Sequence, residues 1–319
     1  MRRRSLLAAL AAGTAATAGC SGVLDSEDPP TPEDPSSGTP PSTPTETGPT
    51  TPASQVDLSL PFEAVSPEAA ADGPAVPDDW VAYGRSASAL QVVPEAVSFG
   101  HEEPVRFALA NGTDSTVQFN PYNWRLHKHA AGEWVRIEPT VIPEPVTDLP
   151  SGESHVWELA TIAESRPDSW RRTDRSTLRL DRLGGGTYAF STAGVVDSPP
   201  LATTVTLDAP ELSLSVREGT TVTDDGSPLR AERPHDDRIE RITVSAADDA
   251  ADPTVHCAES LRRRPLLGDA LALLRDRDAE SVVVVGPSNV QATADPVRES
   301  TITFDGAAYA VRREFASAE

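Results

Sequence analysis

Two residue types are almost missing from this chain, and cysteine is the first. Only Cys20 and Cys257 occur among its 319 residues. A disulfide framework of the kind that holds small secreted domains together is therefore excluded if Cys20 carries another bond, since Cys257 then has no partner. Cys257 lies in an apolar-leaning run, Val255–Ala258, so we expect a small buried side chain there rather than a reactive thiol.

Lysine is the second scarce residue, because Lys128 is the only one and every other basic residue is arginine. Asp and Glu together number 49, and the net charge is −22. Nucleic-acid binding needs a basic face, so this charge balance argues against a nucleic-acid partner.

The sequence also lacks the short motifs that carry common chemistries. It contains no Gly-x-Ser-x-Gly, His-Glu-x-x-His, Cys-x-x-Cys, phosphate-loop or dinucleotide-binding pattern. Gly184-Gly185-Gly186 has no following helix and no lysine, so it predicts a turn. His127 and His129 alternate on one strand face but lack a third ligand, and we expect solvent-facing histidines without metal. These absences predict no catalytic residue, no metal and no cofactor.

What the chain does have begins at its N-terminus. Arg3 and Arg4 precede an apolar run, Leu6–Ala18, that is too short to span a bilayer, which is typical of an export signal over 1–20. The arginine pair resembles the twin-arginine export motif. Thr17-Ala18-Gly19-Cys20 resembles a lipobox, which implies that Cys20 becomes a lipidated N-terminus. The alternative is an ordinary signal peptide with a chance cysteine.

An acidic, arginine-over-lysine chain with such a signal resembles the secreted lipoproteins of haloarchaea. The resemblance implies an extracytoplasmic protein, anchored to the outer face of the cell membrane through the lipid on Cys20, with an envelope protein or glycan as its partner. In concentrated salt the screening length falls to a few Å, so a dense acidic surface costs little stability there.

Two segments without regular structure are expected after the signal. Residues 21–55 are rich in Pro, Thr, Ser, Asp and Glu and cannot bury enough apolar surface to fold, so they predict a disordered tether. Residues 56–86 hold four prolines and form an irregular lead-in, with Trp80 and Tyr83 expected to pack on the domain after it.

Residues 87–209 predict an antiparallel β-sandwich. Short alternating runs separated by turn signals recur along this stretch. The expected strands are Ala89–Pro94, Val105–Ala110, Thr116–Asn120, Asn123–His129, Glu133–Glu138, Ser154–Leu159, Thr187–Thr192 and Ala202–Leu207. Trp124 is expected in the sandwich core, and Tyr188 is expected to form a tyrosine corner by bonding back to the backbone.

Three sequence motifs occur in a fixed order here: Gly132-Glu133-Trp134, Leu149–Ser154 and Gly186-Thr187-Tyr188. Together with Pro104–Thr113 they resemble bacterial Ig-like domains related to the BsuPI intracellular-proteinase-inhibitor family. The resemblance implies an Ig-like fold for about 105 residues, whereas inhibitor activity does not follow from a fold. Residues 160–186 depart from the pattern and are interpreted as an inserted recognition loop. Asn111-Gly112-Thr113 is a glycosylation sequon at an expected exposed turn, which makes Asn111 a candidate glycosylation site.

Residues 210–319 predict a small two-layer α+β domain. Strands are expected at Leu212–Val216, Arg238–Ala246, Pro253–Ser260 and Ser281–Val285, with a hairpin of Glu299–Phe304 and Ala307–Arg313 around Asp305-Gly306. Leucines at helical spacing predict a helix over Pro265–Arg277. The arginines Arg262–Arg264, Arg275 and Arg277 could dock an anion, but pairing with Asp269, Asp276, Asp278 and Glu280 is the favoured interpretation.

The sequence therefore predicts a mainly β, non-enzymatic, lipid-anchored protein that serves in binding or in envelope structure. A protease-inhibitor-like module is one alternative. An enzyme in the C-terminal domain is another, and it would require a pocket with converging polar groups and a perturbed ionisable side chain.

Overall fold

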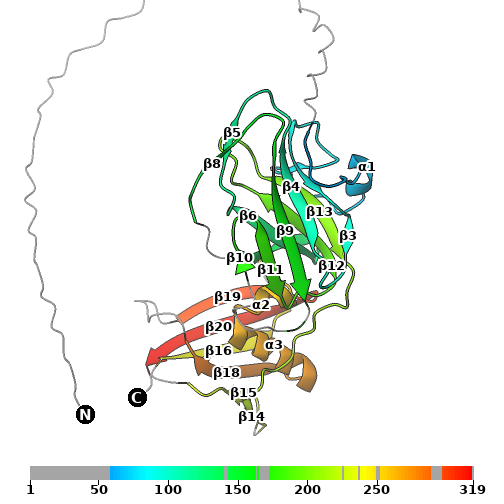
Figure 1. Cartoon of the computed structure of the whole chain (residues 1–319). Helices are drawn as coiled ribbons and strands as arrows, with labels where there is room; N and C mark the ends of the chain where they lie inside the picture. The colour runs from blue at the N-terminus through cyan, green and yellow to red at the C-terminus, as the bar shows by residue number, and fades with distance from the viewer. Residues whose placement is uncertain are drawn as a thin grey trace, which may run out of the picture. The chain divides into compact units, whose positions relative to one another are not determined.

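The computed structural model describes the chain from residue 58 onward, with short gaps. The described ranges are 58–139, 143–162, 164, 172–224, 226–235, 238–248, 252–288 and 297–317. The predicted export signal with Arg3 and Arg4, the lipid anchor at Cys20 and the tether over 21–55 lie outside these residues. From residue 58 on, the described part belongs to one compact unit, and its regular structure is mainly β (Figure 1).

Two sheets and a short strand pair form the first part of the unit. The first sheet has the order β1-β13-β12-β6-β7 with β3 beside β13, the second has the order β10-β11-β9-β4-β2, and β5 pairs with β8. The strands are β1 (Val81–Ala82), β2 (Leu90–Pro94), β3 (Ser98–Phe99), β4 (Val105–Asn111), β5 (Val117–Phe119), β6 (Trp124–Ala130), β7 (Glu133–Glu138), β8 (Thr147–Leu149), β9 (Ser154–Ile162), β10 (Arg172–Thr173), β11 (Thr177–Asp181), β12 (Gly186–Thr192) and β13 (Leu201–Leu207).

Aromatic side chains from the two sheets meet in one core. Phe107 of β4 stacks on Phe190 of β12 with ring centroids 4.2 Å apart, and Trp157 of β9 lies 5.5 Å from the same ring. Trp124 stacks on Phe190 from β6 and is 2% exposed, as the alternation along this strand predicted. Offset aromatic pairs of this kind add to the free energy of area burial.

All eight predicted strands of this part are confirmed to within three residues at either end, but two other expectations are wrong. The pairing is not purely antiparallel, because β11 runs parallel to β9, and β1 and β3 run parallel to β13. Part of the expected loop over 160–186 is a strand instead: β11 buries Leu178 and Leu180 in the core. The middle of that segment, residues 165–171, lies outside the described residues.

The lead-in before β2 packs on the first part through a small core of its own. It contains α1 (Pro67–Ala70) and β1. The hydroxyl of Tyr83 donates to the carbonyl of Val65 at 2.7 Å, and the ring of Trp80 lies 4.8 Å from that of His127. Both aromatic residues thus contact neighbouring structure, as predicted.

A seven-stranded sheet and two helices form the second part. Its strand order is β14-β15-β18-β16-β20-β19-β17. The elements are β14 (Thr221–Thr223), β15 (Leu229–Glu232), β16 (Arg238–Ala246), β17 (Thr254–His256), α2 (Ala258–Leu261), α3 (Pro265–Arg277), β18 (Ser281–Pro287), β19 (Val297–Phe304) and β20 (Ala307–Ser317). Helix α3 has the predicted bounds and packs on β16 and β18 through its leucines.

Local turn chemistry accounts for the predicted hairpin of this sheet. Asp305 and Gly306 both take a positive φ between β19 and β20, which an Asp-Gly pair tolerates. The apolar strand β18 lies inside the sheet between β15 and β16, as its composition predicted.

Two predicted strands of this part are wrong. Leu212, Leu214 and Val216 alternate and pack against the core beneath α3, but their backbone joins no sheet. Residues Pro253–Ser260 divide into β17 and α2, because Ser260 Oγ accepts from the amide of Cys257 at 3.2 Å and caps the helix.

Candidate functional site

A buried ion pair joins the first sheet to helix α2. The ammonium Nζ of Lys128, on β6, lies 2.6 Å from Oε1 of Glu259, in the first turn of α2. The same oxygen accepts from the amide of Gly184 at 3.0 Å and lies 3.3 Å from the hydroxyl of Tyr188. The carboxylate side chain is fully buried, so these contacts offset part of the cost of removing it from water.

The tyrosine corner predicted for Tyr188 lies at this ion pair. Its hydroxyl donates to the carbonyl of Gly184 at 2.6 Å, and its ring centroid lies 5.6 Å from Nζ of Lys128. Burial raises the pKa of the Tyr188 hydroxyl, and the charge of Glu259 adds to this. Burial also raises the pKa of the Cys257 thiol to about 11, so the thiolate is scarce at neutral pH.

The three glycines after Leu183 form a turn against the segment that leads to the second part. A Cβ on Gly184 would lie 2.1 Å from the amide nitrogen of Leu212, and one on Gly185 would lie 1.7 Å from the carbonyl oxygen of Ala209. Only glycine permits this approach of two backbones. Close packing of two backbones thus accounts for Gly184 and Gly185.

A second buried ionic cluster lies beside the first. The side chain of Arg262 is 3% exposed and contacts Glu138, at the end of β7, and Asp181, at the end of β11. Arg263 pairs with the same Glu138. The pairing predicted for the arginine patch is wrong in its partners: Arg262 and Arg263 contact acids of the first two sheets, and Arg275 pairs with Asp305 between β19 and β20.

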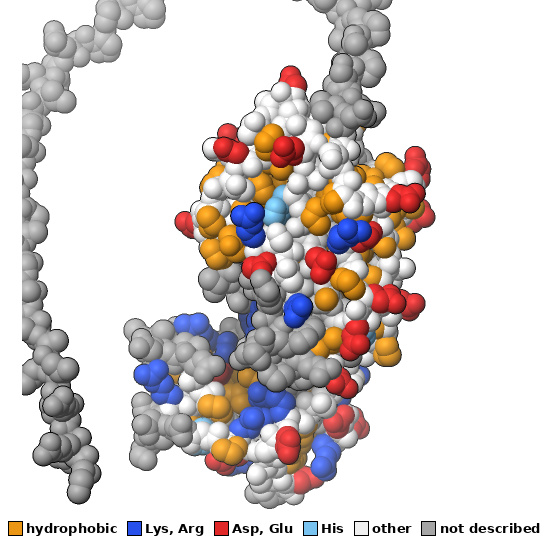
Figure 2. Space-filling model, viewed as in Figure 1, with side chains coloured by type: hydrophobic (Ala, Val, Ile, Leu, Met, Phe, Trp, Pro, Cys, Tyr) orange, Lys and Arg blue, Asp and Glu red, His pale blue; other side chains and the backbone are white. Residues whose placement is uncertain are grey.

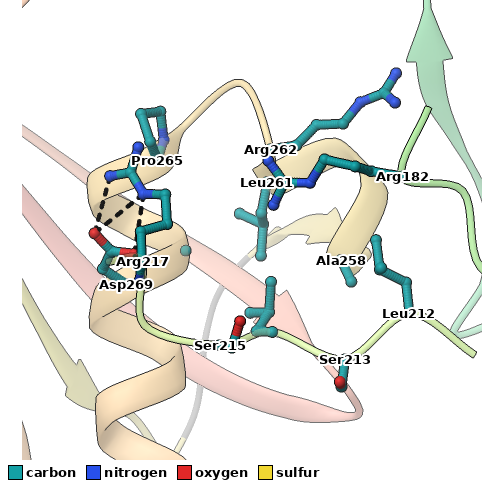
Figure 3. A pocket seen from close by; sticks show the side chains of 12 residues that line it. Arg182, Leu212, Ser213, Ser215, Arg217, Ala258, Leu261, Arg262, Pro265 and Asp269 are labelled. Carbon is teal, nitrogen blue, oxygen red and sulfur yellow. Dashed lines mark hydrogen bonds and ion pairs between the residues drawn. The ribbon is translucent and has the colours of Figure 1, made fainter. Parts of the chain in front are cut away.

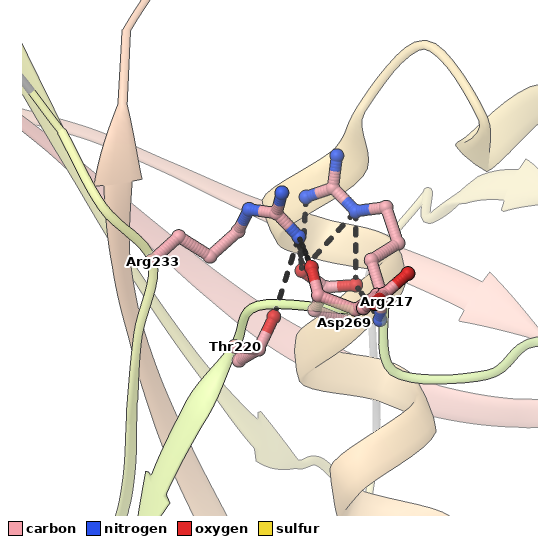
Figure 4. A network of polar contacts seen from close by, with 5 residues as sticks. Arg217, Thr220, Arg233 and Asp269 are labelled. Atoms are coloured by element: carbon pink, nitrogen blue, oxygen red, sulfur yellow. Dashed lines mark hydrogen bonds and ion pairs between the residues drawn. The ribbon is translucent and has the colours of Figure 1, made fainter.

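Asp269 also has partners that its position in the sequence does not suggest. It is 1% exposed in α3, and its carboxylate accepts from Nε and Nη2 of Arg217 at 3.1 and 2.9 Å (Figure 4). Nη1 of Arg233 lies 3.7 Å from the same carboxylate and 3.3 Å from the hydroxyl of Thr220. The fork contact fixes the Leu212–Arg217 segment against α3.

The hollow beside this network is too small for a substrate. Ser213, Ser215, Arg182 and the start of α3 line it, with a cavity volume of about 30 Å³ (Figure 3). A space of that size holds about one water molecule.

A larger cleft lies between β7 and the β17–α2–α3 turns, and we call it the basic cleft. Its volume is about 520 Å³, within the range of small-molecule sites. It is lined by Arg136, Arg263, Arg264, Trp134, His256 and Ser260, with Glu133, Val135, Thr254 and Val255. Three arginines and one glutamate thus line this cleft, in a chain whose net charge is −22. The face drawn in Figure 2 shows several basic side chains over the second part, with acidic side chains among them and over the first part.

The charges of the basic cleft are incompletely compensated. Burial and the charge of Arg313 lower the pKa of Arg264, and the charge of Glu240 raises it. Glu240 pairs with Arg313, whose Nη2 lies 2.5 Å from Oε1 of Glu240. Burial first, and then the charges of Arg125 and Arg263, lower the pKa of Arg136. The charge of Glu138 acts in the opposite direction. Within the described ranges the exposed guanidinium of Arg264 makes no hydrogen bond or ion pair.

His256 lies in the same cleft with one ring nitrogen unused. The residue is 7% exposed, and Nδ1 lies 3.1 Å from Oγ of Ser260, while Nε2 has no hydrogen-bond partner among the described residues. Burial, helped by the charge of Arg264, lowers the pKa of His256 to about 4. The ring is therefore neutral at pH 7.

The structure contradicts the expected exposure of the candidate glycosylation site. Asn111 is fully buried, and its Nδ2 donates to the carbonyls of Ser115, Leu149 and Pro150 at 2.8–3.1 Å. Its Oδ1 accepts from the amide and hydroxyl of Thr113. In the folded protein the amide that would carry sugar is thus used to hold β4 beside β8.

The expectation that both strand histidines face solvent is also wrong for His127. A register shift between Leu126 and His127 places His127 against Trp80, where it is 6% exposed. His129 instead packs on Trp134 with ring centroids 5.0 Å apart. Across the described ranges no three His, Cys, Asp or Glu side chains gather as metal ligands.

Sequence reasoning did not find Glu259, Glu138, Trp134 or His256 as parts of a site. The single lysine was the one available signal, since a unique residue in an arginine-rich chain invites the question of what it contacts. No helix within the described part is long and apolar enough to cross a membrane. The chain matches no family model, no curated protein and no solved structure.

Proposed function

We propose that the chain is a lipid-anchored, extracytoplasmic binding protein of the cell envelope that performs no catalysis. In this proposal Cys20 carries the lipid, and residues 21–55 are a tether. An Ig-like sandwich and a two-layer α+β domain then present the binding surface. The N-terminal pattern Arg3-Arg4 … Cys20 supports the anchor, and the shared aromatic core of the first two sheets supports the sandwich.

The observation that carries the binding proposal is the basic cleft. Three arginines line it in a strongly acidic chain, and in the described part of the chain the Arg264 guanidinium makes no hydrogen bond or ion pair. The buried pairs Lys128–Glu259 and Arg262–Glu138 hold the two walls of this cleft together. A preorganised cationic site binds anions at a lower entropic cost than a flexible one.

Fractionation and capture test this proposal. Replacement of Cys20 by Ser is expected to release the protein from the membrane into the medium, whereas continued retention contradicts the anchor. Capture from native envelope in high salt is expected to recover one envelope component with the wild-type chain and less with an Arg264→Glu chain. Equal recovery contradicts the cleft as the binding site.

A serine hydrolase is the second candidate, because Nδ1 of His256 lies 3.1 Å from Oγ of Ser260 inside a cleft. Two observations rank it lower. The lowered pKa of His256, about 4, makes the ring a weak base at neutral pH. The Ser260 hydroxyl donates to the carbonyl of Cys257 at 2.9 Å within the α2 cap. Labelling of Ser260 by a fluorophosphonate would establish the hydrolase, and its absence would leave the binding proposal.

The protease-inhibitor alternative needs the segment 160–186 or a loop at the end of the sandwich to enter a protease cleft, and part of that segment is not free to do so. The segment 160–186, which would have entered a protease cleft, contains the buried strand β11. A deletion test must therefore spare Thr177–Asp181, since removal of Leu178 and Leu180 would empty part of the core.

A further inference from the structure

We infer that the basic cleft recognises an acidic sugar unit, whose anionic group binds between Arg263 and Arg264 and whose ring packs on Trp134. This inference rests on the proposed binding function and names its ligand class. Four properties of the cleft support it: its charge, its aromatic wall, its unused ring nitrogen and its size.

The charge of the cleft selects an anion of carboxylate or sulfate geometry. Guanidinium groups bind such groups through two parallel hydrogen bonds. Arg263 already shares Glu138 with Arg262, and the neighbouring acid of Arg264, Glu240, pairs with Arg313. Burial, and after it the charge of Arg313, lowers the pKa of Arg264, so one further negative charge beside Arg264 would oppose the charge of Arg313.

The aromatic wall favours a sugar over a simple ion. The indole of Trp134 is held in one orientation, because its Nε1 donates to the carbonyl of Ala75 at 2.8 Å and its ring packs on His129. The side chain is only partly buried, so part of it remains open beside Arg136 and Arg263. The C–H face of a pyranose ring packs well on such a fixed indole.

His256 supplies the polar complement. The hydroxyl of Ser260 donates to the carbonyl of Cys257, so Ser260 Oγ acts as an acceptor toward His256. The neutral ring of His256 therefore carries its proton on Nδ1. Nε2 is then an acceptor, and it has no partner among the described residues although the side chain is more than nine-tenths buried. Because Nε2 is itself closed to solvent, a ligand hydroxyl satisfies it only where the cleft wall opens to it, and a carboxylate or sulfate alone does not.

The volume and surroundings agree with a short segment of an acidic glycan. About 520 Å³ accommodates one or two sugar units. The acidic remainder of the chain opposes long-range attraction of any polyanion, so binding must come from contacts inside the cleft. Those contacts are screened less than the long-range repulsion, and added salt is expected to weaken binding little.

Calorimetric titration of the full-length Cys20→Ser chain tests this inference. The probes are trigalacturonate, a galactose trisaccharide carrying sulfate esters, neutral galactotriose and an acidic hexapeptide of Asp and Gly, each in 0.15 M and 3 M KCl. We expect binding of an acidic sugar and none of galactotriose. Preference for the uronate assigns a carboxylate ligand, and preference for the sulfated sugar assigns a sulfate ligand.

Matched variants locate the site. Arg264→Ala is expected to weaken binding of the preferred sugar at least tenfold and Arg264→Lys less, whereas Arg277→Ala, an exposed arginine of α3 outside the cleft, is expected to change it less than twofold. Equal binding by the Arg264 and Arg277 variants overturns the inference, as does tighter binding of the peptide or of galactotriose. If no sugar binds while envelope capture still depends on Arg264, the ligand class is wrong and the binding function stands.

Discussion

Lys128, the only lysine of the chain, lies with its Nζ 2.6 Å from the buried Oε1 of Glu259, 131 residues away. The pair joins β6 to α2, and Tyr188 and Gly184 contact the same carboxylate. One wall of the basic cleft belongs to the sheet that holds Lys128, and the other begins at the helix that holds Glu259. The ion pair therefore positions the proposed binding site.

Removal of one member of this pair is expected to destabilise the fold more than removal of both. Lys128→Met leaves an unpaired buried carboxylate and should lower the free energy of unfolding by about 3 kcal/mol. The double variant Lys128→Met/Glu259→Gln removes both charges and should recover most of that loss. Urea unfolding of the single and double variants measures the coupling, and additive losses would show that the pair is not coupled.

Asn111 is expected to carry no glycan, because its amide is buried and bonded in the folded protein. The intact mass of the protein and peptide mapping check this, and a glycan at Asn111 would contradict the buried placement. Asn111→Ala should cost about 2–3 kcal/mol of stability, since it removes the donor from three backbone carbonyls. Gln118→Ala, which loses one exposed side-chain contact, is the matched control and should change stability little.

The glycine turn is expected to tolerate no side chain. Gly185→Ala would place its Cβ within 1.7 Å of a backbone oxygen, so the variant should unfold at markedly lower temperature or fail to fold. Gly268→Ala is the control: the nearest atom to a Cβ there is 3.7 Å away, and the residue lies inside α3. It should raise stability by about 0.5–1 kcal/mol through helix propensity. Similar melting temperatures for the two variants would refute the close backbone approach.

Stability is expected to fall in mild acid because of two buried histidines. Burial first, and nearby arginines second, lower the pKa of His127 and of His256 to about 4. The unfolded chain binds their protons below about pH 6.5, and the folded chain only below about pH 4. The stability that both histidines contribute is therefore present above pH 6.5 and is lost as the pH falls to 4.

Through each histidine, the free energy of unfolding should fall by about 2 kcal/mol as the pH is lowered from 7 to 5. Denaturant unfolding at several pH values, compared with the double variant His127→Asn/His256→Asn, isolates this contribution from that of the carboxylates. If the difference in free energy of unfolding between wild type and the double variant did not change between pH 7 and pH 5, the neutral buried state of both rings would be contradicted.

Sequence reasoning succeeded where local chemistry decides the structure. Asp305-Gly306 sets a hairpin through positive φ angles, and the leucines of Pro265–Arg277 recur on one helix face, so both elements were predictable. It failed where distant contacts decide. The run Leu212–Val216 alternates like a strand but packs in the core with α3, and Thr177–Asp181 becomes a strand because β9 and β10 lie on its two sides.

The candidate site was hidden for the same reason. Trp134 and Arg136 lie on β7, while His256 and Arg264 come more than a hundred residues later. No motif with fixed spacing can encode such an arrangement. The burial of Glu259 and Asn111 also depends on partners that are remote in sequence, so polarity alone misplaced Asn111 at the surface.

The most direct test of the proposed function is rebinding of the released protein to native envelope. Cys20→Ser protein, collected from the medium, is added to envelope vesicles stripped of the endogenous protein, in 3 M KCl, and the bound fraction is measured by sedimentation. We predict saturable binding that Arg264→Glu reduces at least tenfold and Arg277→Glu leaves within twofold of wild type. Equal binding of all three proteins, or no saturable binding of any, would contradict the proposal that the basic cleft is the binding site of an envelope protein.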